Sequence, residues 1–140
     1  MMFKNILVAI DGSQHGEKAA HLAGEMARMS SADLWVLNTF EPVPSYLGEP
    51  NLSQAISART HEAEEIVAKT QSDVGEIPGH IHSETLEGPP AEAILNLAEV
   101  REIDLIIMGT RGLSRLAGVL LGSQSQKVIS HADCPVMLAR

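Results

Sequence analysis

The stretch of sequence that decides the fold is Asp104-Leu-Ile-Ile-Met-Gly109-Thr-Arg-Gly112, and Gly122-Ser123-Gln-Ser125 follows it after nine further residues. An apolar run ends at the first glycine, and the third glycine precedes two hydroxyl residues at the expected start of a helix. Glycine lets a backbone come close to a ligand or adopt positive φ at little steric cost. The first turn of a helix carries unpaired N–H groups and the positive end of the macrodipole, so it attracts anions. The pattern therefore predicts a phosphate-binding site.

This glycine pattern, G-x2-G-x9-G-[ST], differs from the common phosphate-binding motifs. No Gly-Lys-[ST] follows, and the spacing is not G-x-G-x-x-G, so it is neither a Walker A motif nor a dinucleotide fingerprint. Ser123-Gln-Ser-Gln126 also matches a capping box, which would explain Ser123 and Gln126 without a ligand. A capped helix start can still present its N–H groups outward. We therefore retain the phosphate interpretation, in which the Ser125 hydroxyl reaches a phosphate oxygen.

Five segments have the patterns of β-strands. Ile6–Ile10, Leu34–Leu37 and Leu105–Met108 are continuous apolar runs, as expected of buried strands. His80–Leu86 alternates polar and apolar residues, which indicates an exposed edge strand. Pro135–Leu138 is expected to form the last strand.

Helices are expected between these strands. Ser13 is a candidate N-cap for the first helix, and Glu41–Pro50 is rich in proline, so it predicts a loop before a longer second helix. A third helix is expected to begin at Gly88-Pro-Pro90, and a short one at about Ser123. The apolar faces of the first three helices are expected to be Ala19, Leu22, Ala23, Met26 and Ala27; Ile56, Ala63, Ile66, Val67 and Val74; and Ala91, Ile94, Leu95 and Ala98.

The alternation of strands and helices indicates the fold class. It predicts an α/β protein: a single doubly wound domain over residues 1–140, with a five-stranded parallel sheet of order 3-2-1-4-5 and helices on both faces. In such a sheet, ligands bind at the carboxyl ends of the strands where the strand order reverses, here between the first and fourth strands. Asp11 ends the first strand and Gly109 ends the fourth. We therefore expect these two breaks in the chain to meet at one site.

Several polar side chains near these breaks are further candidates. The Asp11 carboxylate could accept from a ribose hydroxyl or hold a metal beside phosphate, although Asp-Gly is also an ordinary turn signal. Arg111 and Arg115 flank the glycine loop and could neutralise phosphate or simply be solvated. Lys127, one turn into the last helix, is expected to be solvated. Asn38, where the second apolar run ends, is also a candidate ligand-binding residue.

Three parts of the chain carry a family resemblance: the glycine pattern, Lys4-Asn-Ile-Leu-Val-Ala-Ile-Asp11-Gly-Ser13 at the start, and Gln126-Lys-Val-Ile-Ser with Cys134-Pro-Val136 at the end. On these residues the chain resembles the universal stress proteins, in their ATP-binding branch, over nearly its whole length. The resemblance implies that the protein binds ATP, with Mg²⁺ carried by the nucleotide phosphates.

The resemblance also implies which residues surround the nucleotide. They are Ala9, Ile10 and Asp11 in the pocket, Met108, Gly109, Thr110 and Gly112 at the adenine and ribose, and Gly122, Ser123, Gln124 and Ser125 at the triphosphate. With Asn38 and Arg111 they make up the candidate nucleotide-binding set. Gln124 departs from the family, whose members usually carry a small apolar residue there. The backbone N–H of Gln124 is kept, so binding is expected to survive.

Two other groups of residues invite functional interpretations. His80, His82 and Glu84 share one face of a strand and could hold a metal, but mixed polar residues on an exposed edge are the simpler account. His131 and Cys134 suggest a nucleophile pair. We expect Cys134 to be buried instead, because a cysteine before a proline in a strand normally packs in the interior.

Composition excludes several classes of function. The net charge of −8 argues against a nucleic-acid-binding face, and no apolar run approaches the length of a membrane span. The N-terminal apolar run is too short for a signal peptide. Together with a single cysteine, this predicts a cytoplasmic protein.

Two classes of function remain. The chain lacks a Walker lysine, a kinase-type catalytic loop and an obvious base for an attacking water, which favours an ATP-binding regulatory protein with little or slow hydrolysis. The alternatives are a slow ATPase or phosphoryl-transfer enzyme, and a binder of another adenine nucleotide such as AMP or cyclic AMP. The hydroxyls of Ser123 and Ser125 favour a ligand with several phosphates.

The last strand predicts how the protein assembles. It is apolar and lies at a sheet edge, and an exposed apolar edge needs a cover. A homodimer that pairs the two last strands through Val136 and Leu138 would cover each edge with an identical surface, and the family resemblance points the same way. The alternative is that the short strand only packs under the helices.

Overall fold

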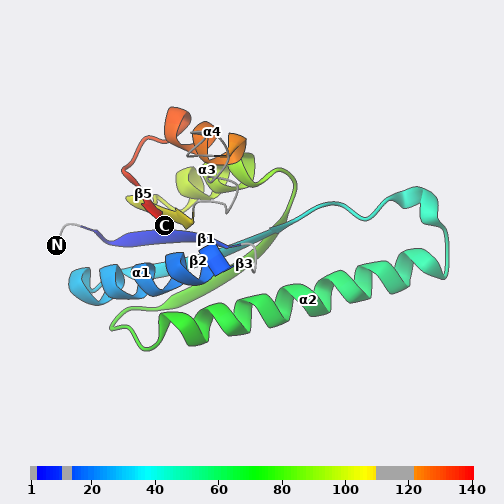
Figure 1. Cartoon of the computed structure of the whole chain (residues 1–140), viewed down its shortest axis with the longest axis horizontal. Coiled ribbons are helices and arrows are strands. Elements are labelled where there is room, and N and C mark those ends of the chain that lie inside the picture. The colour runs from blue at the N-terminus through cyan, green and yellow to red at the C-terminus, as the bar shows by residue number, and fades with distance from the viewer. Residues whose placement is uncertain (1–2, 11–13, 110–121) are drawn as a thin grey trace.

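The computed structural model describes residues 3–10, 14–109 and 122–140. Its elements alternate along the chain (Figure 1). They are β1 (Asn5–Ile10), α1 (Gln14–Ser30), β2 (Asp33–Phe40), a 3-10 turn (Ser45–Leu47), α2 (Asn51–Val74), β3 (Ile81–Glu87), α3 (Pro90–Val100), β4 (Leu105–Gly109), α4 (Ser123–His131) and β5 (Val136–Ala139). All five expected strands are present; β3, β4 and β5 each end one residue later than predicted, and β2 extends to Phe40.

The five strands form one parallel sheet of order β3-β2-β1-β4-β5. Helices α1 and α2 cover one face, and α3 and α4 cover the other (Figure 1). A hydrophobic core lies on each face of the sheet, and alternate residues of β1 point into one or the other. Ile6 and Val8 pack with α1, whereas Leu7 packs with α3. The apolar run of β1 is therefore explained by burial on both sides, and the predicted fold class and strand order are confirmed.

The two edge strands differ in exposure. Every residue of β3 is exposed or half-buried, which confirms the prediction of a water-facing edge. In β5, Val136 and Leu138 are half-buried and pack into the core on the α3 side. The last strand thus packs under the helices, while its outer backbone edge has no partner strand within the described chain.

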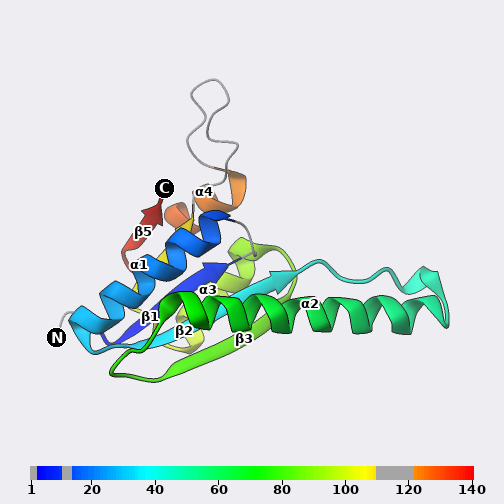
Figure 2. The same cartoon turned by 60° about the horizontal axis from the view of Figure 1, so that its bottom comes forward.

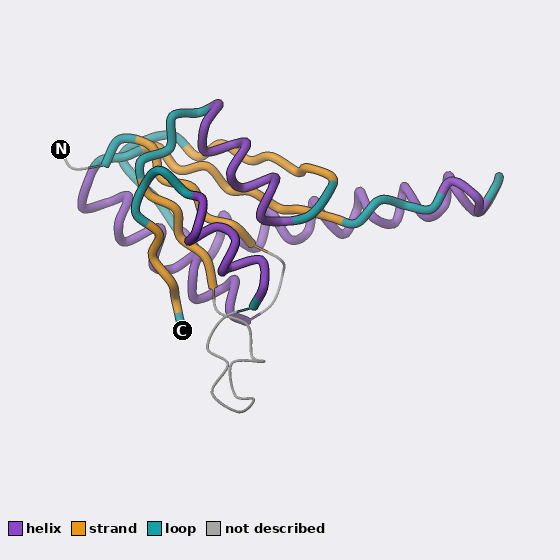
Figure 3. Tube along the Cα trace, turned by 90° about the horizontal axis from the view of Figure 1, so that it is seen from above, coloured by secondary structure: helices purple, strands orange, loops and turns teal. Residues whose placement is uncertain are grey.

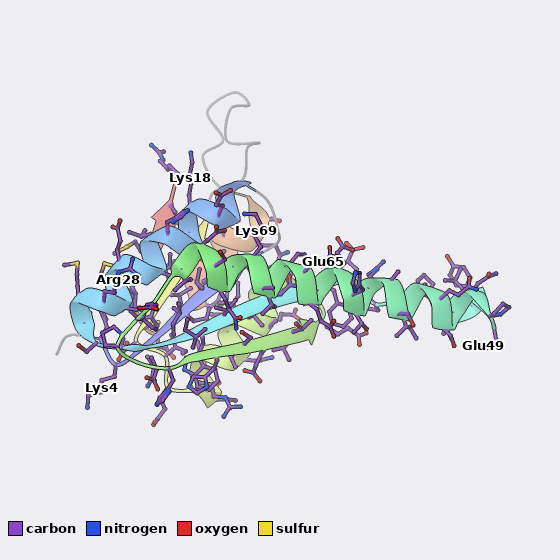
Figure 4. The ribbon with its side chains drawn as sticks, turned by 90° about the horizontal axis from the view of Figure 1, so that it is seen from below. Lys4, Lys18, Arg28, Glu49, Glu65 and Lys69 are labelled. Atoms are coloured by element: carbon purple, nitrogen blue, oxygen red, sulfur yellow. The ribbon has the colours of Figure 1, made fainter. Side chains whose placement is uncertain are left out.

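Helix α2 has an anchored half and a projecting half. At the anchored end Val74 is buried, and the Arg28 guanidinium donates to the carbonyl oxygens of Val74 at 2.8 Å and Glu76 at 3.1 Å (Figure 4). The first half extends past the sheet like an arm (Figures 2 and 3), and the buried residues of α2 begin only at Ala63. Ile56 is 48% exposed, so its assignment to the core face was wrong, because this half of α2 extends past the sheet (Figure 2).

The buried face of α3 also differs from the predicted one. Ala91 and Ile94 are buried as expected, but Ala93 and Leu97 complete the face. Leu95 and Ala98 are only half-buried and line a surface cleft beside the end of α4. The helix touches both the sheet and α4, so its buried stripe is turned relative to the one that spacing alone predicts. None of the described helices combines the length and apolar character needed to cross a bilayer.

Candidate functional site

The carboxyl ends of β1 and β4 lie side by side at the switch point of the sheet. Ala9 is in register with Met108, and Gly109 follows Met108 in β4. Ile10 and Met108 are buried. The structure therefore brings together the candidates Ala9, Ile10, Met108 and Gly109, as the topology predicts. The candidates Asp11, Thr110, Arg111 and Gly112 lie outside the described residues, as do Ser13 and Arg115.

Asn38 joins this edge from the neighbouring strand. It is in register with Ile10, the last residue of β1, and it is only 3% exposed. It lines a cleft of about 250 Å³ between the end of β2 and the middle of α2. Asn38 therefore lies next to the switch point, and its amide is the polar group that β2 contributes there.

The start of α4 differs from the predicted capping box. The N-cap is Gly122, with φ −73° and ψ 165°, and no side chain caps the helix. The Gln126 N–H donates to the Gly122 carbonyl at 3.1 Å, and Ser123 is already the first helical residue. The expected box centred on Ser123 is therefore wrong by one position. The N-cap residue therefore offers no side-chain acceptor to the first N–H groups of α4, an arrangement that suits an anion.

The two serines of this turn have different environments. Ser123 is exposed, whereas Ser125 is 4% exposed and counts among the buried polar residues. Lys127 is exposed, as predicted. In this conformation Ser123 is the more accessible of the two hydroxyls at the start of α4.

The unusual residue Gln124 has a structural partner. Its side-chain Oε1 accepts a hydrogen bond of 2.9 Å from the Ala91 N–H, in the first turn of α3. The N-cap of α3 is Pro89, which makes no side-chain cap bond of its own. Gln124 therefore caps α3 from a neighbouring helix, and its amide is directed to α3 rather than to a phosphate.

A charged cluster between α1 and α2 was missed by sequence reasoning. The Lys69 ammonium lies 3.0 Å from Asp73 Oδ2 and 3.4 Å from Glu17 Oε2, on the side of α2 that meets α1 (Figure 4). The hydrogen bond to Asp73 raises the pKa of Lys69, and the charges of Asp73 and Glu17 act in the same direction. Lys69, Glu17 and Ile10 line a small cleft of about 190 Å³. The available signal was the four-residue spacing of Lys69 and Asp73 on one helix.

The possible metal site on β3 is not assembled. His82 stacks on the Trp35 ring at a centroid distance of 4.1 Å and lies 3.6 Å from Asp33. Glu84 lies 3.7 Å from Arg101. Within the described ranges, the ligand atoms close enough to share a metal belong to Glu17, His21 and Asp73 instead, and there Lys69 already supplies the positive charge.

The possible nucleophile Cys134 is poorly suited to attack. Cys134 is half-buried rather than buried as expected. This partial burial raises the pKa of its thiol, and the Asp104 and Asp133 carboxylates act in the same direction. The thiol is thus kept protonated at neutral pH, whereas nucleophilic cysteines need a lowered pKa. The Nδ1 atom of His131 lies 2.9 Å from the Lys127 carbonyl oxygen, so that ring is engaged within its own helix.

Comparison with known proteins agrees with this architecture. The model of the universal stress protein family matches residues 2–140. A universal stress protein of Thermus aquaticus, encoded 3′ of a QAH/OAS sulfhydrylase, is 47% identical over 99% of this chain and 100% of its own length. MJ0531 of Methanocaldococcus jannaschii is 33% identical over 99% of this chain and 83% of its own length. UspA from Lactobacillus plantarum has a similar structure, with a TM-score of 0.84 and 28% identity over 100% of this chain and 99% of its own. The chain therefore belongs to the universal stress protein family.

Proposed function

We propose that this protein is an ATP-binding regulatory protein with little or slow hydrolysis. The observation that carries the proposal is the start of α4, where Gly122 occupies the N-cap without a side-chain acceptor. Helices α1 and α4 begin at the end of the sheet where β1 and β4 finish (Figures 2 and 3). Unpaired N–H groups at a helix start attract anions, and a phosphate chain is the anion that a switch point commonly receives.

The residues at this end of the sheet suit both parts of a nucleotide, the phosphates and the nucleoside. The α4 start offers N–H donors for phosphates, whereas buried Ile10, Met108 and Asn38 offer a mostly apolar floor. The described part of the α4 turn offers no carboxylate, so Mg²⁺ would arrive bound to the phosphates and supply charge neutralisation there.

Two solved structures with the same fold are complexes with adenine nucleotides. One is a universal stress protein with cAMP, at a TM-score of 0.74 and 22% identity. The other is from Archaeoglobus fulgidus with dAMP, at a TM-score of 0.62 and 20% identity. At these identities they share the fold with our chain, and their ligands are those of the two proteins. They make AMP and cAMP the competitors that a binding experiment must include.

Calorimetric titration with MgATP, AMP and cAMP tests the proposal directly. We expect ATP to bind most tightly, because only a triphosphate reaches the α4 start with several charged oxygens. No heat of binding with millimolar ATP would refute the nucleotide function. Tighter binding of cAMP or AMP than of ATP would move the function to the alternative ligand class.

The alternative of a slow enzyme is separated by a phosphate-release assay. We expect steady-state turnover well below about 1 per second, the low end of ordinary enzymes, because the described site contains no activated nucleophile or perturbed base. Fast turnover that is lost in Asp11→Asn would place the protein among the ATPases or phosphoryl-transfer enzymes.

We also propose that the protein is a homodimer paired through the outer edge of β5. That edge has no partner strand within the described chain, and Val136 and Leu138 beside it stay half-buried. Sedimentation should give twice the 15.0 kDa chain mass at tens of micromolar, a working concentration for an interface of about 1,600 Å². A monomer at that concentration would show that β5 only packs under its own helices.

A further inference from the structure

The Asn38 side chain is buried, and no other residue in the described part of the chain hydrogen-bonds to its amide. Asn38 is 3% exposed, and it lies two residues after Val36, which belongs to the core between the sheet and α1, so it faces the same side. Among the described residues, the polar side-chain atoms that are both fully enclosed and unpaired belong to Trp35 and Glu84. The Asn38 amide is not one of these enclosed atoms, so it keeps access to the cleft that it lines.

The size and position of this cleft suit one part of a ligand. Its volume is about 250 Å³, below the roughly 300–1,000 Å³ of sites that hold a whole drug-sized molecule. Ile66 lines both this cleft and the one that reaches Ile10. From β2 across β1 to β4 the sheet advances by about 10 Å, which an extended nucleoside triphosphate can span. A ligand of that length can therefore extend from the cleft to the carboxyl end of β4.

The chemistry of the cleft favours a neutral ring over a phosphate. Phe40, Ala63 and Ile66 provide apolar walls, and Glu62 adds negative charge. The Arg59 guanidinium at the same cleft already donates to the Glu41 carbonyl oxygen. An unpaired amide offers one carbonyl acceptor and one N–H₂ donor, and a buried polar group of this kind gains most from a ligand that satisfies both.

We propose that Asn38 reads the N6/N7 edge of an adenine base and selects adenine over guanine. This inference rests on the proposed nucleotide function and adds a specificity-determining residue to it. The amide carbonyl accepts from the adenine N6–H, and the amide N–H₂ donates to N7, the bidentate pairing that an asparagine makes with adenine. Guanine presents two acceptors, O6 and N7, on the same edge. One of the two hydrogen bonds is then lost, and two oxygens face each other.

The test combines base analogues with variants of Asn38. Titrations with MgATP, MgGTP and the magnesium complex of 7-deaza-ATP, which lacks N7, are made on the wild type, on Asn38→Leu and on Asn38→Ala. We expect the wild type to bind ATP about tenfold or more tightly than either analogue, within the range measured for a bidentate pair. Both variants should bind ATP more weakly and lose most of the difference between ATP and 7-deaza-ATP.

Two controls separate recognition from folding. Asn96, an exposed asparagine on α3, should be replaceable by leucine without changing any of the three affinities. Asn38→Leu keeps the branched shape of the side chain, directs its larger methyl groups toward the cleft and removes an unpaired amide, so its Tm should equal or exceed that of the wild type. A clear fall in Tm would mean that Asn38 serves the structure, and would overturn the proposal.

The outcomes also separate this inference from the proposed function. If the wild type binds none of the nucleotides, the nucleotide function itself fails. If it binds ATP but does not distinguish 7-deaza-ATP, or if Asn38→Leu retains the wild-type preference, the nucleotide function stands and the role of Asn38 is refuted.

Discussion

Helices α3 and α4 begin next to each other, but the backbone N–H groups at their two starts differ in their hydrogen-bond partners. The N-caps are Pro89 and Gly122, and neither provides a side-chain cap bond. In α3, however, the Ala91 N–H is taken by Gln124 at 2.9 Å. Within residues 3–10, 14–109 and 122–140, no side chain accepts from the start of α4 in this way. The difference teaches that Gln124, the unusual residue of the glycine motif, caps the start of α3 and not that of α4, which is why we propose α4 as the anion-binding helix.

The largest effect is expected from Gly122→Val. The φ of −73° at Gly122 is one that any residue adopts, so the variant should fold. Its branched side chain would occupy the space that a phosphate needs beside the first N–H groups of α4. We expect the affinity for ATP to fall at least about 100-fold, some 2.7 kcal/mol, by calorimetry, with a circular dichroism spectrum like that of the wild type. Unchanged affinity in a folded variant would remove α4 from the binding site.

Gln124→Ala is expected to have a smaller effect, which falls on stability rather than on ATP binding. The variant leaves the Ala91 N–H without its acceptor, and the loss of a helix cap costs about 0.5–2 kcal/mol. Denaturant unfolding should report this decrease in the free energy of unfolding, while the ATP affinity changes less than about threefold. As a control, Gln126→Ala changes a neighbouring exposed glutamine and should leave the stability nearly unchanged. A large loss of ATP affinity in Gln124→Ala would mean that its side chain belongs to the ligand site.

The smallest effect is expected from Gly122→Ser, which gives α4 the kind of cap that α3 receives from Gln124. Serine and glycine N-caps differ by only a few tenths of a kcal/mol, so the unfolding free energy should rise slightly or stay the same. The new hydroxyl would compete with phosphate for the first N–H groups of α4, so we expect a several-fold loss of ATP affinity. Tighter ATP binding would show instead that the hydroxyl acts as an additional phosphate ligand.

The sequence predicted the fold because its signals are local. The apolar runs of β1 and β4 end at sharp breaks, and their burial on both faces leaves a continuous apolar pattern. Strand order then followed from the alternation of elements and the right-handed crossover rule. For the same reason the sequence predicted that the carboxyl ends of β1 and β4 meet, which the structure confirms with Ala9 beside Met108.

The failures concern contacts between elements that are distant in sequence. Gln124 and Ala91 are 33 residues apart, and no local pattern indicates that one caps the other. Periodicity placed Ile56 on the apolar face of α2 but could not show that the helix extends beyond the edge of the sheet. The shift of the α4 cap from Ser123 to Gly122 is a one-residue error, within the usual uncertainty of helix ends.

The most direct test of the central claim compares the backbone amides of the two helix starts during a titration with MgATP. In ¹⁵N NMR spectra, we expect the amides of Ser123, Gln124 and Ser125 to shift and to become protected from hydrogen exchange as ATP binds. The Ala91 amide, already bonded to Gln124, should change little. Saturation with ATP that leaves the α4 amides unmoved, or that perturbs Ala91 more than the α4 amides, would contradict the assignment of α4 as the phosphate-binding helix.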